Sequence, residues 1–273
     1  MFLQMMKKGI LLLCVLLTVS CGEYQKMLKS EDTGEKYAYA ENLYNEGVEE
    51  DSNRKLRKAL RLFEQLMPQL RGKPQGQRIS YLVADAYYQV GDYLLASFEF
   101  ERFLQTYPES EKAEEAMFKM AASNYYESPR YFLDQTETDK AIVLLQTYLD
   151  TYPDGEYAEQ ANDMATELRI KLEKKAYEIA KQYHKTMDYK AAVVSFDNFI
   201  TTYPGSPFRE AAFYYKFDSA YELAINSYLQ LMEERLVEAK EYYTAYRKYY
   251  PEGEYGDAIE ASLDDIDARL QNF

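Results

Sequence analysis

One short phrase recurs four times along this chain, and it constrains the fold more than any other feature. Each copy places an aromatic residue four positions before a Tyr-Pro pair, and the pairs are Tyr107-Pro108, Tyr152-Pro153, Tyr203-Pro204 and Tyr250-Pro251. The four prolines are 45, 51 and 47 residues apart. A period of this length is typical of proteins that stack repeated supersecondary units.

The residues before each proline are spaced as one face of an α-helix. In the first of the four copies, Ala96, Phe100, Phe103 and Tyr107 follow one another at steps of three or four residues. An alanine twelve positions before the proline and a bulky residue eight before it recur in every copy: Ala96 and Phe100, Ala141 and Leu145, Ala192 and Phe196, Ala239 and Tyr243. Because proline cannot continue a helix, each copy predicts a helix that ends at its Tyr-Pro pair.

A second helical stretch precedes each of these helices, so the repeating unit is predicted to be a helix pair closed by proline. The chain resembles the tetratricopeptide repeat at seven landmark positions: Ala84, Tyr87, Gly91, Tyr93, Ala96, Phe100 and Pro108. A weaker additional copy comes first, around Tyr44 and Phe63. The resemblance implies an all-α fold, an α-solenoid of about five tetratricopeptide-like helix pairs in a right-handed superhelix, and one elongated domain.

The predicted boundaries follow from these copies. Residues 1–20 are predicted to be a lipoprotein signal peptide, 21–36 a lipid-anchored tether, and 37–273 the repeat solenoid. The helix pairs are expected at approximately 37–74, 77–110, 113–155, 172–206 and 212–253, with a C-terminal helix over 254–273. A polar stretch from Glu49 to Arg54 and an interruption from Ser128 to Glu137 separate the two helices of the first and third pairs.

The N-terminus predicts export and lipid attachment. Lys7 and Lys8 precede an apolar run from Gly9 to Val19, which is far shorter than the roughly 20 residues that span a bilayer. The run ends in Leu-Thr-Val-Ser-Cys21-Gly, which resembles the lipobox of bacterial lipoproteins. The resemblance implies cleavage before Cys21, a diacylglycerol on its thiol and acylation of its amine. The alternative is an ordinary signal peptide with an incidental cysteine.

Composition excludes several classes of function. The chain has 46 acidic and 32 basic residues, a net charge of −14, which argues against nucleic acid as a partner. It has one histidine, His184, and Cys21 would be its only cysteine after cleavage, so His/Cys metal sites and histidine-based triads are excluded. No Gly-rich phosphate loop or EF-hand spacing is present. We therefore predict no catalytic residues, no metal and no cofactor.

Two helix faces are candidate binding surfaces, because the first helix of each tetratricopeptide pair lines the concave side. When the first two helix pairs are aligned with the repeat landmarks, six residues fall at positions that line the concave side. We call this predicted peptide-binding surface the "aromatic groove": Tyr37, Tyr44, Arg78, Tyr81, Asp85 and Tyr88. The fourth pair gives a "basic stripe" that would receive an acidic partner surface: Lys174, Tyr177, Lys181, His184 and Lys185. The alternatives are that the tyrosines serve only repeat packing and that the lysines form a solvated helix face.

The lipobox, the mature length and the five helix pairs together resemble the BamD family of lipoproteins, which belong to the outer-membrane β-barrel assembly machinery. The resemblance implies a non-enzymatic scaffold on the periplasmic face of the outer membrane, held there through its lipid anchor. Its partners would be the periplasmic domains of the central barrel subunit, BamA, other subunits of the machinery, and unfolded outer-membrane proteins. A periplasmic scaffold for division or peptidoglycan coordination is the alternative. A starch-binding uptake lipoprotein fits poorly, since the chain has no Trp.

Overall fold

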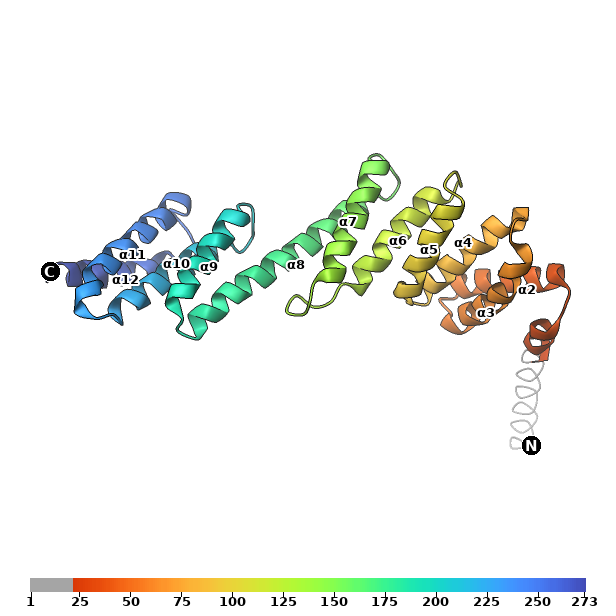
Figure 1. The fold of residues 1–273 in the computed structure, drawn as a ribbon, viewed down its shortest axis with the longest axis horizontal. Coiled ribbons are helices and arrows are strands. Elements are labelled where there is room, and N and C mark those ends of the chain that lie inside the picture. The colour runs from red at the N-terminus through yellow and green to blue at the C-terminus, as the bar shows by residue number, and fades with distance from the viewer. Residues whose placement is uncertain (1–21) are drawn as a thin grey trace, which may run out of the picture. The chain divides into compact units, whose positions relative to one another are not determined.

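The computed structural model describes residues 22–273. All regular elements in this range are helices, which confirms the predicted all-α class. The predicted signal peptide and the lipid attachment residue Cys21 lie outside the described residues. A short helical segment over residues 22–29 comes first, and the other helices follow in the order shown in Figure 1.

Eleven longer helices follow in the described chain, joined by connections of three to eight residues. Their bounds are α2 (Thr33–Glu49), α3 (Asn53–Leu70), α4 (Pro74–Gln89), α5 (Tyr93–Thr106), α6 (Ala113–Glu127), α7 (Thr136–Thr151), α8 (Ala158–Lys185), α9 (Tyr189–Thr202), α10 (Arg209–Ile225), α11 (Leu229–Tyr249) and α12 (Gly256–Leu270).

The described chain divides into two compact units. The first unit contains the described residues up to Ser128 together with Thr136–Ala165, and the second contains Pro129–Gln135 together with Thr166–Phe273. The division falls within α8, and the non-helical segment between α6 and α7 belongs to the second unit. The sequence predicts one elongated domain over residues 37–273, and this stays a prediction.

Local chemistry accounts for where several helices begin and end. The Asp32 carboxylate accepts hydrogen bonds of 2.9 Å from the amides of Gly34 and Glu35, and so caps the free N–H groups at the start of α2. Between α4 and α5 the chain turns at Gly91, whose φ of +77° is costly for any residue with a Cβ atom. At the other end of α5, the Tyr107 amide bonds the Phe103 carbonyl at 2.8 Å before proline stops the helix.

The repeated positions form the core, as the helical spacing predicts. The alanine twelve positions before each proline is completely buried: Ala96, Ala141, Ala192 and Ala239. The aromatic residue five positions before each proline is also buried: Phe103, Tyr148, Phe199 and Tyr246. The two tyrosines of this set also make a polar link. Tyr148 donates to Glu114 of α6 at 3.0 Å, and Tyr246 donates to Glu210 of α10 at 2.9 Å, so each ties the second helix of its pair to the first.

Two segments differ from their expected roles. Residues 22–29 lie in the predicted tether, but Tyr24 and Met27 are buried in the core of the first unit, because they fall three residues apart on one helical face. The first helix of the fourth pair was expected to begin near residue 172. Instead α8 begins at Ala158, and Ala161, Ala165 and Leu168 form a buried stripe on its first turns.

Candidate functional site

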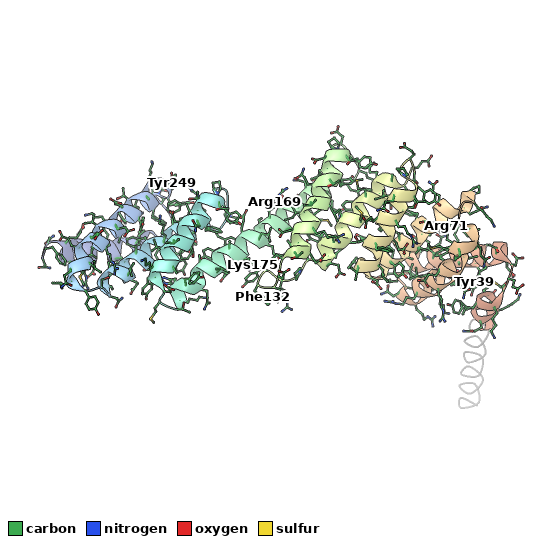
Figure 2. All side chains as sticks on the ribbon, viewed as in Figure 1. Tyr39, Arg71, Phe132, Arg169, Lys175 and Tyr249 are labelled. Carbon is green, nitrogen blue, oxygen red and sulfur yellow. The ribbon has the colours of Figure 1, made fainter. Side chains whose placement is uncertain are left out.

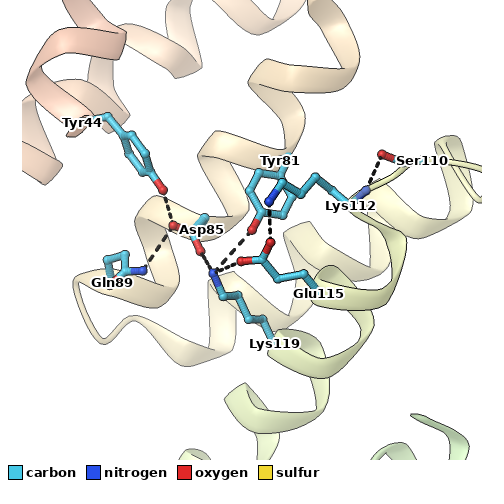
Figure 3. Close-up of polar contacts among 8 residues, drawn as sticks. All are labelled: Tyr44, Tyr81, Asp85, Gln89, Ser110, Lys112, Glu115 and Lys119. Atoms are coloured by element: carbon cyan, nitrogen blue, oxygen red, sulfur yellow. Dashed lines mark hydrogen bonds and ion pairs between the residues drawn. The ribbon is translucent and has the colours of Figure 1, made fainter. Parts of the chain in front are cut away.

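The centre of the aromatic groove is a buried carboxylate. Asp85 on α4 is only 1% exposed, and two side chains from different helices reach it. Tyr44 of α2 donates its hydroxyl to Asp85 Oδ2, and the ammonium of Lys119 from α6 pairs with Asp85 Oδ1 (Figure 3). A buried charge is stable only when it is paired and hydrogen-bonded, so these contacts explain how Asp85 is accommodated.

Lys119 extends this network along α6. Its ammonium lies 2.7 Å from Glu115 Oε1 and 3.4 Å from the Tyr81 hydroxyl, while Lys112 pairs with the other oxygen of Glu115 at 2.7 Å (Figure 3). The first helices of three consecutive pairs, α2, α4 and α6, are therefore joined by one chain of polar contacts. We call Tyr44, Tyr81, Asp85, Glu115 and Lys119 the "Asp85 network".

The sequence prediction named three members of this network and missed two. Tyr44, Tyr81 and Asp85 were predicted by aligning the first and second helix pairs with the repeat landmarks. Glu115 and Lys119 lie in the third pair, for which no groove positions were predicted. Aligning Ala122 with Ala84 would have placed Lys119 at the position of Tyr81. The repeat therefore contained the signal that was needed.

Burial and charge set the protonation states in the network. Burial raises the pKa of Tyr44, and the neighbouring Asp85 raises it further, so its hydroxyl stays a donor at neutral pH. Burial likewise raises the pKa of Tyr81. For Glu115 burial alone would raise the pKa, but hydrogen bonds from Lys112 and Lys119 outweigh it and lower the pKa to about 2.

We expect Glu115 to make the first unit sensitive to acid. The unfolded pKa near 4.5 lies above the folded value of about 2, so the folded state binds fewer protons and its stability falls as pH drops from about 4.5 to 2. Urea unfolding at several pH values should show that a Glu115→Gln variant is less stable than the parent at pH 6 and that the difference shrinks toward pH 2. The exposed control Glu109→Gln should show no such convergence, and a constant gap for Glu115→Gln would contradict the expectation.

The rings of the aromatic groove are mostly used in packing. Tyr81 is buried, with its ring centroid 5.7 Å from that of Phe103, and Tyr88 is half-buried against Tyr93 and Tyr126. Tyr37 and Tyr44 are also half-buried. Arg78 is exposed and bonds Glu41 of α2 through its Nε at 2.7 Å. Ligand contact by the groove therefore stays a prediction, and it concerns the half-buried rings and Arg78 rather than Tyr81.

The basic stripe lies along α8 in the second unit, and aromatic rings pair with two of its cations. Lys181 lies 4.8 Å from the ring centroid of Tyr215, and Lys174 lies 4.7 Å from that of Tyr131. Tyr177 is buried and stacks on Phe208 at 5.3 Å, while Lys185 is exposed. These contacts do not test whether the stripe binds an acidic partner, so that role stays a prediction.

His184 lies beside a serine and an aspartate, but this trio cannot act as a nucleophile with its base. Its Nδ1 is 3.0 Å from Ser219 Oγ, and its Nε2 is 3.4 Å from Asp218 Oδ2. Ser219 is completely buried and donates its hydroxyl to the Tyr215 carbonyl at 2.6 Å, so no substrate can reach it. Burial raises the pKa of Asp218, and the nearby His184 lowers it by a smaller amount.

An open cavity of about 410 Å³ in the first unit was not foreseen from the sequence. It lies among α3, α4 and α5, and its walls combine the apolar Met67 and Ile79 with Arg71 and Arg102 (Arg71 is labelled in Figure 2). No repeat landmark marks these four positions: Arg71 follows the last residue of α3, and Arg102 lies on α5.

Two features are absent from the part of the chain that the structure describes. Residues 22–273 contain no cluster of three or more His, Cys, Asp or Glu side chains that could hold a metal ion. None of the helices in this range combines the length and the apolar composition that crossing a membrane requires.

Helix pairs, proline-closed turns and side-chain networks between successive first helices define a class of protein: tetratricopeptide-type helical repeat proteins, whose working surfaces are the faces of packed helices. The chain belongs, within that class, to the YfiO family of outer membrane lipoproteins, whose model matches residues 36–194 and 171–272. It is therefore a lipid-anchored protein of the outer membrane, which confirms the predicted location at that membrane.

A curated relative supports the same family. The chain is 28% identical over 184 residues to a protein of Aquifex aeolicus (strain VF5) named "Putative outer membrane protein assembly factor BamD". The match covers 67% of this chain and 58% of that relative, so the chain spans little more than half of the relative's length. With the family match, this likeness confirms the predicted resemblance to BamD.

Proposed function

We propose that this protein is a non-enzymatic subunit of the machinery that assembles β-barrel proteins in the outer membrane. The observation that carries the proposal is the match to the outer membrane lipoprotein family across both helical units, from residue 36 to residue 272. The name of the Aquifex aeolicus relative, an outer membrane protein assembly factor, supports it. The work of such a subunit is binding, and the side chains of Tyr44, Asp85 and Lys119 serve links between helices.

Each of the two helix faces binds a different partner in this proposal. The basic stripe docks an acidic surface on the periplasmic domains of a BamA-like central barrel subunit, and the aromatic groove receives unfolded outer-membrane proteins. Further subunits of the machinery occupy other faces. Cys21 carries the lipid and holds the protein on the periplasmic side of the membrane.

We expect charge reversal on the basic stripe to weaken capture of the barrel subunit in a salt-dependent way. The double change Lys181→Glu and Lys185→Glu should reduce capture on the order of ten-fold at 50 mM salt and about two-fold at 500 mM, because salt screens exposed charges. The same charge change on exposed lysines outside α8, Lys140→Glu with Lys248→Glu, is the control. Equal capture by the parent and the Lys181/Lys185 variant at low salt would contradict the role of the stripe.

The proposal is tested by affinity purification of the tagged, lipidated protein from solubilised outer membrane, with mass spectrometry of what copurifies. The expected result is a large barrel protein with repeated periplasmic domains. Recovery of division or peptidoglycan-coordinating proteins in its place would overturn the assembly role and favour the alternative of a periplasmic scaffold with the same fold.

A further inference from the structure

An ordered apolar tip interrupts the third helix pair. Residues 128–135 connect α6 to α7 without helix, and within them Phe132 is 60% exposed and Leu133 is 48% exposed. Exposed phenylalanine and leucine side chains side by side mark a contact surface more often than isolated ones do. We call Phe132 and Leu133 the "apolar tip".

The backbone beneath the tip is fixed by a buried amide. Gln135 is 6% exposed and donates its Nε2 to the carbonyls of Arg130 at 2.9 Å, Leu133 at 3.0 Å and Asp134 at 3.3 Å. A further bond of 3.0 Å joins the Leu133 amide to the Arg130 carbonyl. The conformational entropy of the loop is therefore already lost before any partner binds, which is how a preorganised anchor gains affinity.

Two lysines of α8 contact the same loop. Lys175 donates its Nζ to the Leu133 carbonyl at 2.7 Å, and Lys174 lies over the ring of Tyr131. Figure 2 shows Phe132 beside the part of α8 that carries Lys175. The loop thus lies against the helix instead of projecting from it, which suits a polypeptide partner better than insertion into a bilayer.

The surroundings of the tip are basic on an otherwise acidic protein. Lys174 and Lys175 contact the loop and Arg130 belongs to it, whereas Asp134 is the only carboxylate among residues 129–135, and the whole chain carries −14. Charge complementarity favours a partner with acidic side chains around its apolar contact residue.

We propose that the apolar tip, rimmed by Arg130, Lys174 and Lys175, is a preformed docking site for a polypeptide segment that presents an aromatic or aliphatic side chain flanked by carboxylates. This site adjoins the basic stripe, with which it shares Lys174, but it does not depend on the identity of the partners proposed above. Its failure would leave the assembly role untouched, because that role is tested by copurification.

A display library of random twelve-residue peptides, selected on the full-length lipidated protein in detergent, tests the site. We expect enriched peptides with Asp or Glu around a Phe, Leu or Tyr, and binding by fluorescence anisotropy that falls about ten-fold or more in a Phe132→Ser/Leu133→Ser variant. Phe98→Ser is the matched control, because Phe98 is 57% exposed on α5 of the other unit. Arg130→Glu should weaken the binding of the same peptides in a salt-dependent way.

Three outcomes would overturn the site. One is a set of enriched peptides whose binding is unchanged in the Phe132→Ser/Leu133→Ser variant or is lost equally in Phe98→Ser. Another is enrichment of Lys and Arg in place of Asp and Glu. The third is that the double variant loses binding to vesicles of phosphatidylethanolamine and phosphatidylglycerol but not to peptides, which would assign the tip to the membrane.

Discussion

Lys119→Met is expected to destabilise the first unit by about 3 kcal/mol or more, because it leaves the Asp85 carboxylate buried without its cation. Methionine keeps most of the volume of the lysine stem, so the loss reports the missing charge rather than a cavity. Tyr44 still donates to Asp85, and this contact limits the loss without replacing the ion pair. Urea unfolding followed by circular dichroism measures the free energy of unfolding.

Two variants make this expectation specific. Lys112→Met removes a cation that also pairs with Glu115, but its side chain is 56% exposed, so it should cost less than about 1 kcal/mol. The double variant Asp85→Asn/Lys119→Met removes both buried charges and should recover much of the stability lost in Lys119→Met. A Lys119→Met variant as stable as Lys112→Met would show that the Asp85 network does not hold α4 and α6 together.

Cys21→Ser is expected to abolish lipid attachment and to lower the amount of protein in the outer-membrane fraction by about ten-fold or more. A serine hydroxyl lacks the nucleophilic thiolate chemistry of cysteine, and without acyl chains the protein loses the roughly 0.8 kcal/mol that each buried methylene contributes to membrane binding. Metabolic labelling with an alkyne fatty acid, followed by membrane fractionation, measures both effects.

Cys14→Ser is the matched control, because Cys14 lies inside the apolar run that precedes Cys21. This variant should label and fractionate like the parent. Labelling that persists in Cys21→Ser would mean that another residue carries the lipid, and loss of labelling in Cys14→Ser would mean that the apolar run itself was damaged.

The repeat made the helical class and its buried positions predictable. Ala96, Phe100 and Phe103 could be identified as core residues from spacing alone, because a helix that buries one face must repeat its apolar residues every three or four positions. The proline after each aromatic residue marked where these helices stop. The family resemblance also depended on such landmarks together with the lipobox, and the comparisons confirmed it.

The candidate sites were less predictable, because a helical register identifies a face but not what lies opposite it. Tyr81 was assigned to the groove, yet its ring is buried against Phe100 and Phe103. Lys119 and Glu115 were missed because their importance comes from meeting Asp85 across helices. Gln135 was not singled out either, since nothing local indicates that its amide bonds three carbonyl groups.

The sequence by itself determined the helical class, the ends of the proline-closed helices and the family, because helical periodicity, proline and capping residues act within about a dozen residues of one another. Only the tertiary structure decided which polar groups are buried together and which apolar side chains remain outside. Asp85 and Lys119 are 34 residues apart, and Leu133 and Lys175 are 42 residues apart. Such contacts depend on how neighbouring helix pairs pack, and packing is settled by the shape of many side chains at once.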